Sequence, residues 1–117
     1  MTILKREEIF GFKDIKTEVV EVPEWGGSVI VKCMTGSERD EFEQSCLSRD
    51  GKRLTLDNIR AKLICKTVVD EDGNKLFSTA DVESLGAKSA VALDRIFTVA
   101  QKLSGMTKED IDELTKN

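Results

Sequence analysis

The 117-residue sequence contains no histidine, which excludes mechanisms that need an imidazole, such as His-paired nucleophiles and His-ligated metals. It has no excess of basic residues either, since 22 acidic and 18 basic side chains give a net charge of −4. A general nucleic-acid binder would carry a basic stripe, so this class is disfavoured. What remains is a small acidic domain whose composition, 39% hydrophobic and 34% charged, is that of a soluble globular protein.

Long apolar runs are also missing. Residues 1–10 include four charged side chains, and no stretch is long enough for a signal peptide or a membrane-spanning helix. No linker of low complexity and no internal repeat divides the chain. We therefore expect a single domain over residues 1–117.

The cysteines are few, odd in number and not arranged as a Cys-x-x-Cys pair. Without histidine they cannot complete a common zinc site. We expect Cys33, Cys46 and Cys65 to be reduced thiols of a cytosolic protein that pack as small hydrophobic side chains.

The only proline lies in a predicted β-hairpin. Residues 16–22 (KTEVVEV) and 28–34 (SVIVKCM) are rich in β-branched residues and are typical of strands. The connection from Pro23 to Gly27 combines a fixed turn dihedral with glycines that accept positive φ. Apolar residues stand on both faces of the strands, so helices or a partner must cover the hairpin.

About four to five helices are predicted to pack against this hairpin, which makes the expected fold class α+β. Residues 3–10 are expected to form a short helix with Leu4 and Ile9 on its inner side. The longest helix is expected at residues 88–104, where apolar side chains recur at helical spacing.

Capping signals predict where the other helices begin and end. Hydroxyl residues followed three positions later by a polar side chain predict helix starts near residues 36, 56, 79 and 108. The second of these leads into a helix expected at 56–69. Gly86 and Gly105 are placed to end helices.

The acidic segment Asp70–Lys75 resembles a calcium loop in its Asp-x-Asp-x-Asn spacing, but a lysine stands where the loop glycine should follow. We expect a solvated turn instead, with a second small hairpin between residues 68–69 and 76–77. No nucleophile–base pair is found, so we expect no enzyme, no catalytic residue, no metal and no cofactor.

Several apolar residues have both a structural and a partner-binding interpretation. Trp25, the only tryptophan, either folds back onto the core or stays exposed as an anchor for a partner. The stripe on helix 88–104 either faces the core or forms a groove for a partner. Phe42 is the single apolar residue in a charged run and is expected to be its buried anchor. The candidate partner-binding residues are Trp25, Phe42, Ile96, Phe97 and Leu103.

Four segments carry a family resemblance. They are VPEWGGSV at 22–29, TGSERDEFE at 35–43, VDEDGNKLF at 69–77 and ALDRIFTVAQKLSG at 92–105. In order and spacing, over essentially the full length, the chain resembles the tail assembly chaperones of long-tailed, siphovirus-like bacteriophages. It departs from the pattern at Lys5, where a Ser or Thr helix cap would be expected.

The resemblance implies a non-enzymatic function in the cytoplasm of a bacterial host, for a phage or a prophage. Proteins of this family keep the aggregation-prone tape measure protein soluble, help it recruit tail tube subunits and are absent from the finished virion. The family commonly makes a short product, which this chain resembles, and a longer one by ribosomal slippage. The extra segment of the longer product is thought to engage the tail tube protein. Self-association is left open.

The last three residues suggest a slip site. Thr115-Lys116-Asn117 can be encoded ACA-AAA-AAC, which contains the slippery string A-AAA-AAC. Two other classes of function compete with the chaperone. One is a structural tail or head-completion protein that stays in the particle, and the other is a small enzyme or host regulator.

Overall fold

The computed structural model describes residues 2–48, 51–52 and 55–106. The fold is α+β, as predicted, with a three-stranded antiparallel sheet. The elements in chain order are α1 (Arg6–Gly11), β1 (Thr17–Val22), the 3₁₀ turn η1 (Pro23–Trp25), β2 (Gly27–Lys32), α2 (Gly36–Ser45), α3 (Ile59–Thr67), β3 (Val68–Val69), the 3₁₀ turn η2 (Thr79–Asp81), α4 (Val82–Gly86) and α5 (Ala90–Leu103).

The predicted hairpin is confirmed. Strands β1 and β2 pair antiparallel with Val19 opposite Ile30 and Val22 opposite Gly27. The turn is closed by Gly26, whose φ of 70° lies in the left-handed region that glycine tolerates. Strand β3 pairs with β2 on the other side, so the sheet order is β1-β2-β3 and β1 is an edge strand.

The second small hairpin is also present. Val69 forms a bridge with Lys75, and the amide of Leu76 donates to the carbonyl of Val68 at 3.1 Å. The carboxylate of Asp70 accepts from the amides of residues 72 and 74 at 2.9 and 3.0 Å. This carboxylate therefore stabilises the turn, and the Asp-x-Asp-x-Asn spacing is explained by these hydrogen bonds within the turn.

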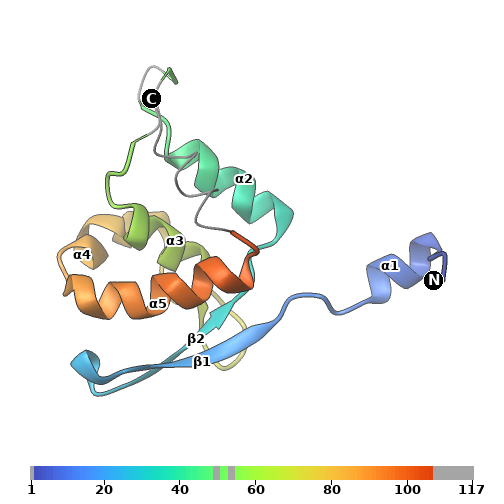
Figure 1. The fold of residues 1–117 in the computed structure, drawn as a ribbon, viewed down its shortest axis with the longest axis horizontal. Coiled ribbons are helices and arrows are strands. Elements are labelled where there is room, and N and C mark those ends of the chain that lie inside the picture. Colours follow the sequence, from blue (N-terminus) through green and yellow to red (C-terminus); the bar gives the residue numbers. More distant parts are fainter. Residues whose placement is uncertain (1, 49–50, 53–54, 107–117) are drawn as a thin grey trace.

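Helices cover one face of the sheet. Helix α5 crosses β1 and β2, and α3 packs beside α5 with α4 beyond it (Figure 1). Alternate strand residues point into this layer, and the largest fully buried side chains are Phe42, Leu63, Ile64, Ile96, Val22, Val31, Val68, Thr67 and Cys46. Cys46 and Cys65 are buried and Cys33 is half-buried, as expected for thiols that pack as small hydrophobic groups.

The capping signals succeed at two of the helix starts. The hydroxyl of Thr35 accepts from the amide of Glu38 at 3.1 Å, and the Glu38 carboxylate accepts from the amide of Thr35 at 2.8 Å. This capping box begins α2 at the predicted place. Asp81 likewise accepts from the amide of Ser78 at 2.8 Å, where η2 leads into α4. The start near residue 108 lies outside the described residues.

The helix expected at 56–69 is wrong at both ends. Helix α3 begins only at Ile59, because Asn58 adopts a left-handed backbone conformation that a right-handed helix cannot include. It ends at Thr67 because the next two residues join the sheet. Nearby, Gly86 has an ordinary helical backbone, and a side chain there would collide with that of Asn58.

The N-terminal helix exists, but its predicted packing is wrong. Helix α1 has no buried residue, and Leu4 and Ile9 are each 54% exposed. Figure 1 shows α1 held away from the sheet and the other helices by an extended segment. The expectation of an inner side failed because no element of the described chain packs against this helix.

Candidate partner-binding site

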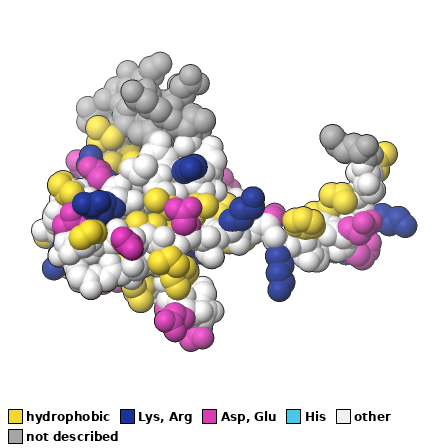
Figure 2. Space-filling view, turned by 60° about the horizontal axis from the view of Figure 1, so that its bottom comes forward, with side chains coloured by type: hydrophobic (Ala, Val, Ile, Leu, Met, Phe, Trp, Pro, Cys, Tyr) yellow, Lys and Arg dark blue, Asp and Glu magenta, His cyan; other side chains and the backbone are white. Residues whose placement is uncertain are grey.

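Exposed apolar side chains gather at the N-terminal end of the chain. We define the arm as residues 2–16, which precede β1. Its large apolar side chains are exposed by the following fractions: Ile3 92%, Leu4 54%, Ile9 54%, Phe10 74%, Phe12 72% and Ile15 41%. Figure 2 shows hydrophobic side chains along the arm. So many exposed apolar groups in one short segment are typical of a surface that another chain covers.

Local contacts give the arm its helix. The Glu8 carboxylate accepts from the amide of Lys5 at 3.1 Å, and the guanidinium of Arg6 lies 4.8 Å from the centre of the Phe10 ring. A helix of six residues is too short to be stable alone in water. Helix α1 therefore lacks the packing that normally stabilises so short a helix within the described part of the chain.

A second apolar surface lies on the sheet. By strand alternation, Val19 and Ile30 point to the face of the sheet opposite α5, and they stand side by side in the register. Val19 is 66% exposed and Ile30 is half-buried. We call this pair the outer sheet row. Val69, opposite Ile30 in β3, extends the row but is buried.

The tip of the hairpin is tied to α5. The guanidinium of Arg95 donates to both carboxylate oxygens of Glu24, at 2.8 and 3.0 Å. This hydrogen bonding lowers the pKa of the Glu24 carboxyl and holds η1 against the helix. Trp25, in the same turn, is 39% exposed, so part of its side chain is buried and part is accessible to solvent.

The other candidate residues lie inward. Phe42 and Ile96 have no exposed surface, and Phe97 and Leu103 are half-buried against the core. The structure does not bring the five candidates together on one exposed face. Their role in partner binding stays a prediction, and for Phe42 and Ile96 it would require the core to open.

Sequence reasoning missed the arm as a site. The signal was present, because six large apolar residues stand within positions 3–15. Leu4 and Ile9 were expected on the inner side of a packed helix, and no local pattern distinguishes an inward face of a helix from an outward one.

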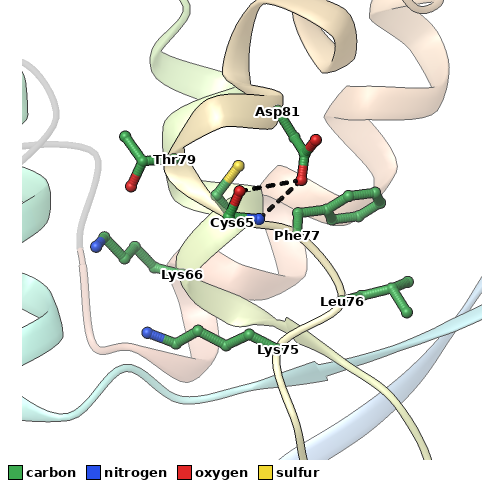
Figure 3. A pocket seen from close by; sticks show the side chains of 8 residues that line it. Cys65, Lys66, Lys75, Leu76, Phe77, Thr79 and Asp81 are labelled. Carbon is green, nitrogen blue, oxygen red and sulfur yellow. Dashed lines mark hydrogen bonds between the residues drawn. The ribbon is translucent and has the colours of Figure 1, made fainter.

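A hollow of about 460 Å³ lies between α3 and the segment that leads into η2 (Figure 3). Lys66 and Lys75 extend along it, and Cys65 forms part of its lining. Burial raises the pKa of the Cys65 thiol, which keeps it protonated at neutral pH. Asp81 is engaged in capping η2. Within the described residues, no group of three or more Cys, Asp or Glu side chains could hold a metal ion.

An ion cluster beside this hollow fixes α2 to the sheet. The Glu38 carboxylate pairs with Lys32 of β2 and, at 2.6 Å, with Lys75. Burial alone would raise the pKa of Glu38, but the hydrogen bonds from the two lysines and from Thr35 overcome this effect and lower it to about 2.

The low pKa of Glu38 predicts acid sensitivity. The carboxylate stabilises the fold above its unfolded pKa of 4.5, and this contribution is lost as the pH falls toward 2. We expect Glu38→Gln to lower the free energy of unfolding by about 2–3 kcal/mol at pH 7 and to flatten its pH dependence between these values. Urea denaturation at several pH values measures both effects. The control is Glu71→Gln, because Glu71 is exposed in the turn that follows β3 and lies outside this cluster. An unchanged acid dependence in Glu38→Gln would contradict the assignment.

Comparison with known proteins identifies the class of protein to which this chain belongs. Residues 9–117 match the family described as phage tail assembly chaperone. The chain belongs to the phage tail assembly chaperone family. No curated protein matches it. Among the solved structures, the chain is similar to the tail assembly chaperone of bacteriophage HK97, at 21% sequence identity and a TM-score of 0.56. The similarity covers 76% of this chain and 85% of the HK97 chain, and it shows a shared fold.

No helix in the described part of the chain is long and apolar enough to cross a membrane.

Proposed function

We propose that this protein keeps the tape measure protein of a phage tail soluble during assembly by covering its apolar helical segments. It acts in the cytoplasm of the bacterial host, helps to recruit tail tube subunits and is absent from the finished virion. The contact with the tail tube protein is made by a longer, frameshifted product. Membership of the tail assembly chaperone family supports this proposal.

The observation that carries the proposal is the exposed apolar arm. The side chains of Phe10 and Phe12, which are 74% and 72% exposed, would cover the apolar stripe of a client helix and remove it from water. Burial of such side chains is favourable by roughly 1.5–3 kcal/mol each. The net charge of −4 helps to keep the resulting complex in solution. The mechanism needs contact and no covalent chemistry.

Co-expression with the tape measure protein tests the proposal. We expect the client to move from the insoluble to the soluble fraction when this chain is present. Titration calorimetry with tape measure fragments should then show micromolar-order binding with a negative heat-capacity change, the mark of apolar burial. Failure to solubilise the client would contradict the proposal. Detection of this chain in purified virions by mass spectrometry would favour the alternative, a structural tail or head-completion protein.

A further inference from the structure

A second concave surface lies apart from the arm. The hollow of about 460 Å³ between α3 and the segment that leads into η2 adjoins another, of about 250 Å³, which is bounded by α2, α3 and the start of α4. Cys65, Lys66 and Thr79 line both hollows, so the two are parts of one groove. We call this surface the lysine groove, because Lys62, Lys66 and Lys75 lie along it.

The ammonium groups of the lysine groove point toward α2. Lys62 and Lys66 are four residues apart on α3 and therefore lie on the same side of this helix. The amine of Lys62 donates to the carbonyl of Ser45 at 2.8 Å, and the amine of Lys66 lies 2.5 Å from the Glu41 carboxylate. Figure 3 shows Lys75 extended in the same direction as Lys66. The three lysines thus form a row of positive charge along one wall of the groove.

Carboxylates only partly neutralise this row. Glu38 is shared by Lys32 and Lys75. Lys62 has no carboxylate partner among the residues that the structure describes. The lysines at the groove outnumber the carboxylates, with Lys32, Lys62, Lys66 and Lys75 against Glu38, Glu41 and Asp81. The groove is therefore a place of local positive charge on a chain whose net charge is −4.

The other side of the groove is apolar. Phe77 and Val82 are half-buried against the core, and the buried thiol of Cys65 forms part of the lining. Leu76, which also lines the groove, is 51% exposed. In Figure 3, Leu76 and the ring of Phe77 lie on one side of the hollow, and the amine of Lys66 lies on the other. A ligand that fits this groove combines negative charge with an apolar side chain.

We propose that the lysine groove binds an acidic segment of a partner protein. Carboxylates four residues apart on a helix have the same spacing as Lys62 and Lys66 and can pair with both. An apolar side chain of the segment then covers Leu76. Nucleic acid is a poorer match, because so small a surplus of positive charge neutralises few phosphates and Leu76 offers no contact to a phosphate backbone.

The pair formed by Glu41 and Lys66 is the contact that the acidic segment must replace. The Glu41 side chain is 62% exposed, and ion pairs so open to solvent contribute little to stability. The Lys66 side chain is only 16% exposed, so it is already held in the groove and loses little freedom when a new carboxylate binds. A partner that supplies two carboxylates exchanges one ion pair for two.

Fluorescence anisotropy of a labelled synthetic helix, titrated with the purified full chain, tests the proposal. The probe carries one leucine and two glutamates four residues apart, and its counterpart has glutamines in place of the glutamates. We expect the glutamate probe to bind roughly tenfold more tightly than the glutamine probe, and the double variant Lys62→Gln, Lys66→Gln to lose this preference.

The matched control is the double variant Lys88→Gln, Lys102→Gln. It makes the same change of charge at two exposed lysines outside the groove and should bind the glutamate probe as the natural chain does. Equal thermal unfolding temperatures would show that both double variants are folded. Equal affinity of the natural chain for the two probes, or an equal loss of binding in the control, would overturn the proposal.

Removal of the competing carboxylate gives an independent test. Glu41→Gln takes the ion-pair partner from Lys66, so we expect this variant to bind the glutamate probe roughly twofold more tightly than Glu71→Gln does. Glu71→Gln makes the same change of charge in the exposed turn after β3. No difference between these variants would overturn the proposal, as would tighter binding of single-stranded poly-uridine RNA than of the glutamate probe by the natural chain.

None of these assays contains the tape measure protein, and the arm takes no part in the lysine groove. The two proposals can therefore fail separately. A groove that shows no preference for glutamate would leave the proposed function in place, and failure to solubilise the client would leave the assignment of the groove in place.

Discussion

Replacing Phe42 by alanine is expected to lower the free energy of unfolding by about 3–5 kcal/mol. The side chain of Phe42 has no exposed surface and lies in the core between α2 and the rest of the helical layer. Its removal costs both the transfer free energy of the ring and the cavity that remains. A domain of this size has little stability beyond that amount, so a large unfolded fraction should appear at 37 °C.

Urea denaturation measures this effect, and Phe12→Ala is the matched control. Phe12 is 72% exposed, so the same change there should alter the free energy of unfolding by less than about 0.5 kcal/mol. If Phe42→Ala stayed fully stable and lost only client binding, Phe42 would be a partner residue and its place in the core would be wrong.

The double variant Phe10→Glu, Phe12→Glu should lose the ability to keep the tape measure protein soluble. Each substitution removes an exposed ring and puts a charge where the client's apolar stripe would lie. Loss of two contacts of roughly 1.5–3 kcal/mol each weakens binding by at least a hundredfold, at about 1.4 kcal/mol per factor of ten. Neither side chain contributes to the core, so the thermal unfolding temperature should not change.

Co-expression, titration calorimetry and thermal unfolding together check this second result. The control is Leu56→Glu, Val91→Glu, which alters two apolar residues that are 56% and 58% exposed but lie outside the arm. This control should solubilise the client as well as the natural chain does. If both double variants behaved alike, the arm would have no special role in client binding.

The features that the sequence predicted correctly depend on neighbouring residues. The hairpin follows from two β-branched segments around a Pro-and-Gly turn, and the capping box at Thr35 acts within one helical turn. Helix α5, expected at 88–104 from its apolar stripe, is found at Ala90–Leu103, where the hydroxyl of Ser89 accepts from the amide of Ala92. The resemblance to tail assembly chaperones was likewise available from the sequence, and the family match confirms it.

The features that the sequence mispredicted depend on contacts between distant segments. The capping signal near residue 56 failed because Asn58, whose side chain lies against Gly86 of α4, adopts a left-handed backbone conformation, so that the helix begins only at Ile59. The apolar residues of the arm have the spacing of a packed helix, and only their position outside the core shows that they are exposed.

By itself, then, the amino-acid sequence determined the acidic character, the hairpin, the main helix and the family, because composition and short-range hydrogen bonding fix these properties. Only the tertiary structure decided which apolar side chains are exposed. A phenylalanine in α2 and a phenylalanine in the arm have the same affinity for a nonpolar environment, and the packing of distant elements determines that Phe42 is buried and Phe12 is open to a partner.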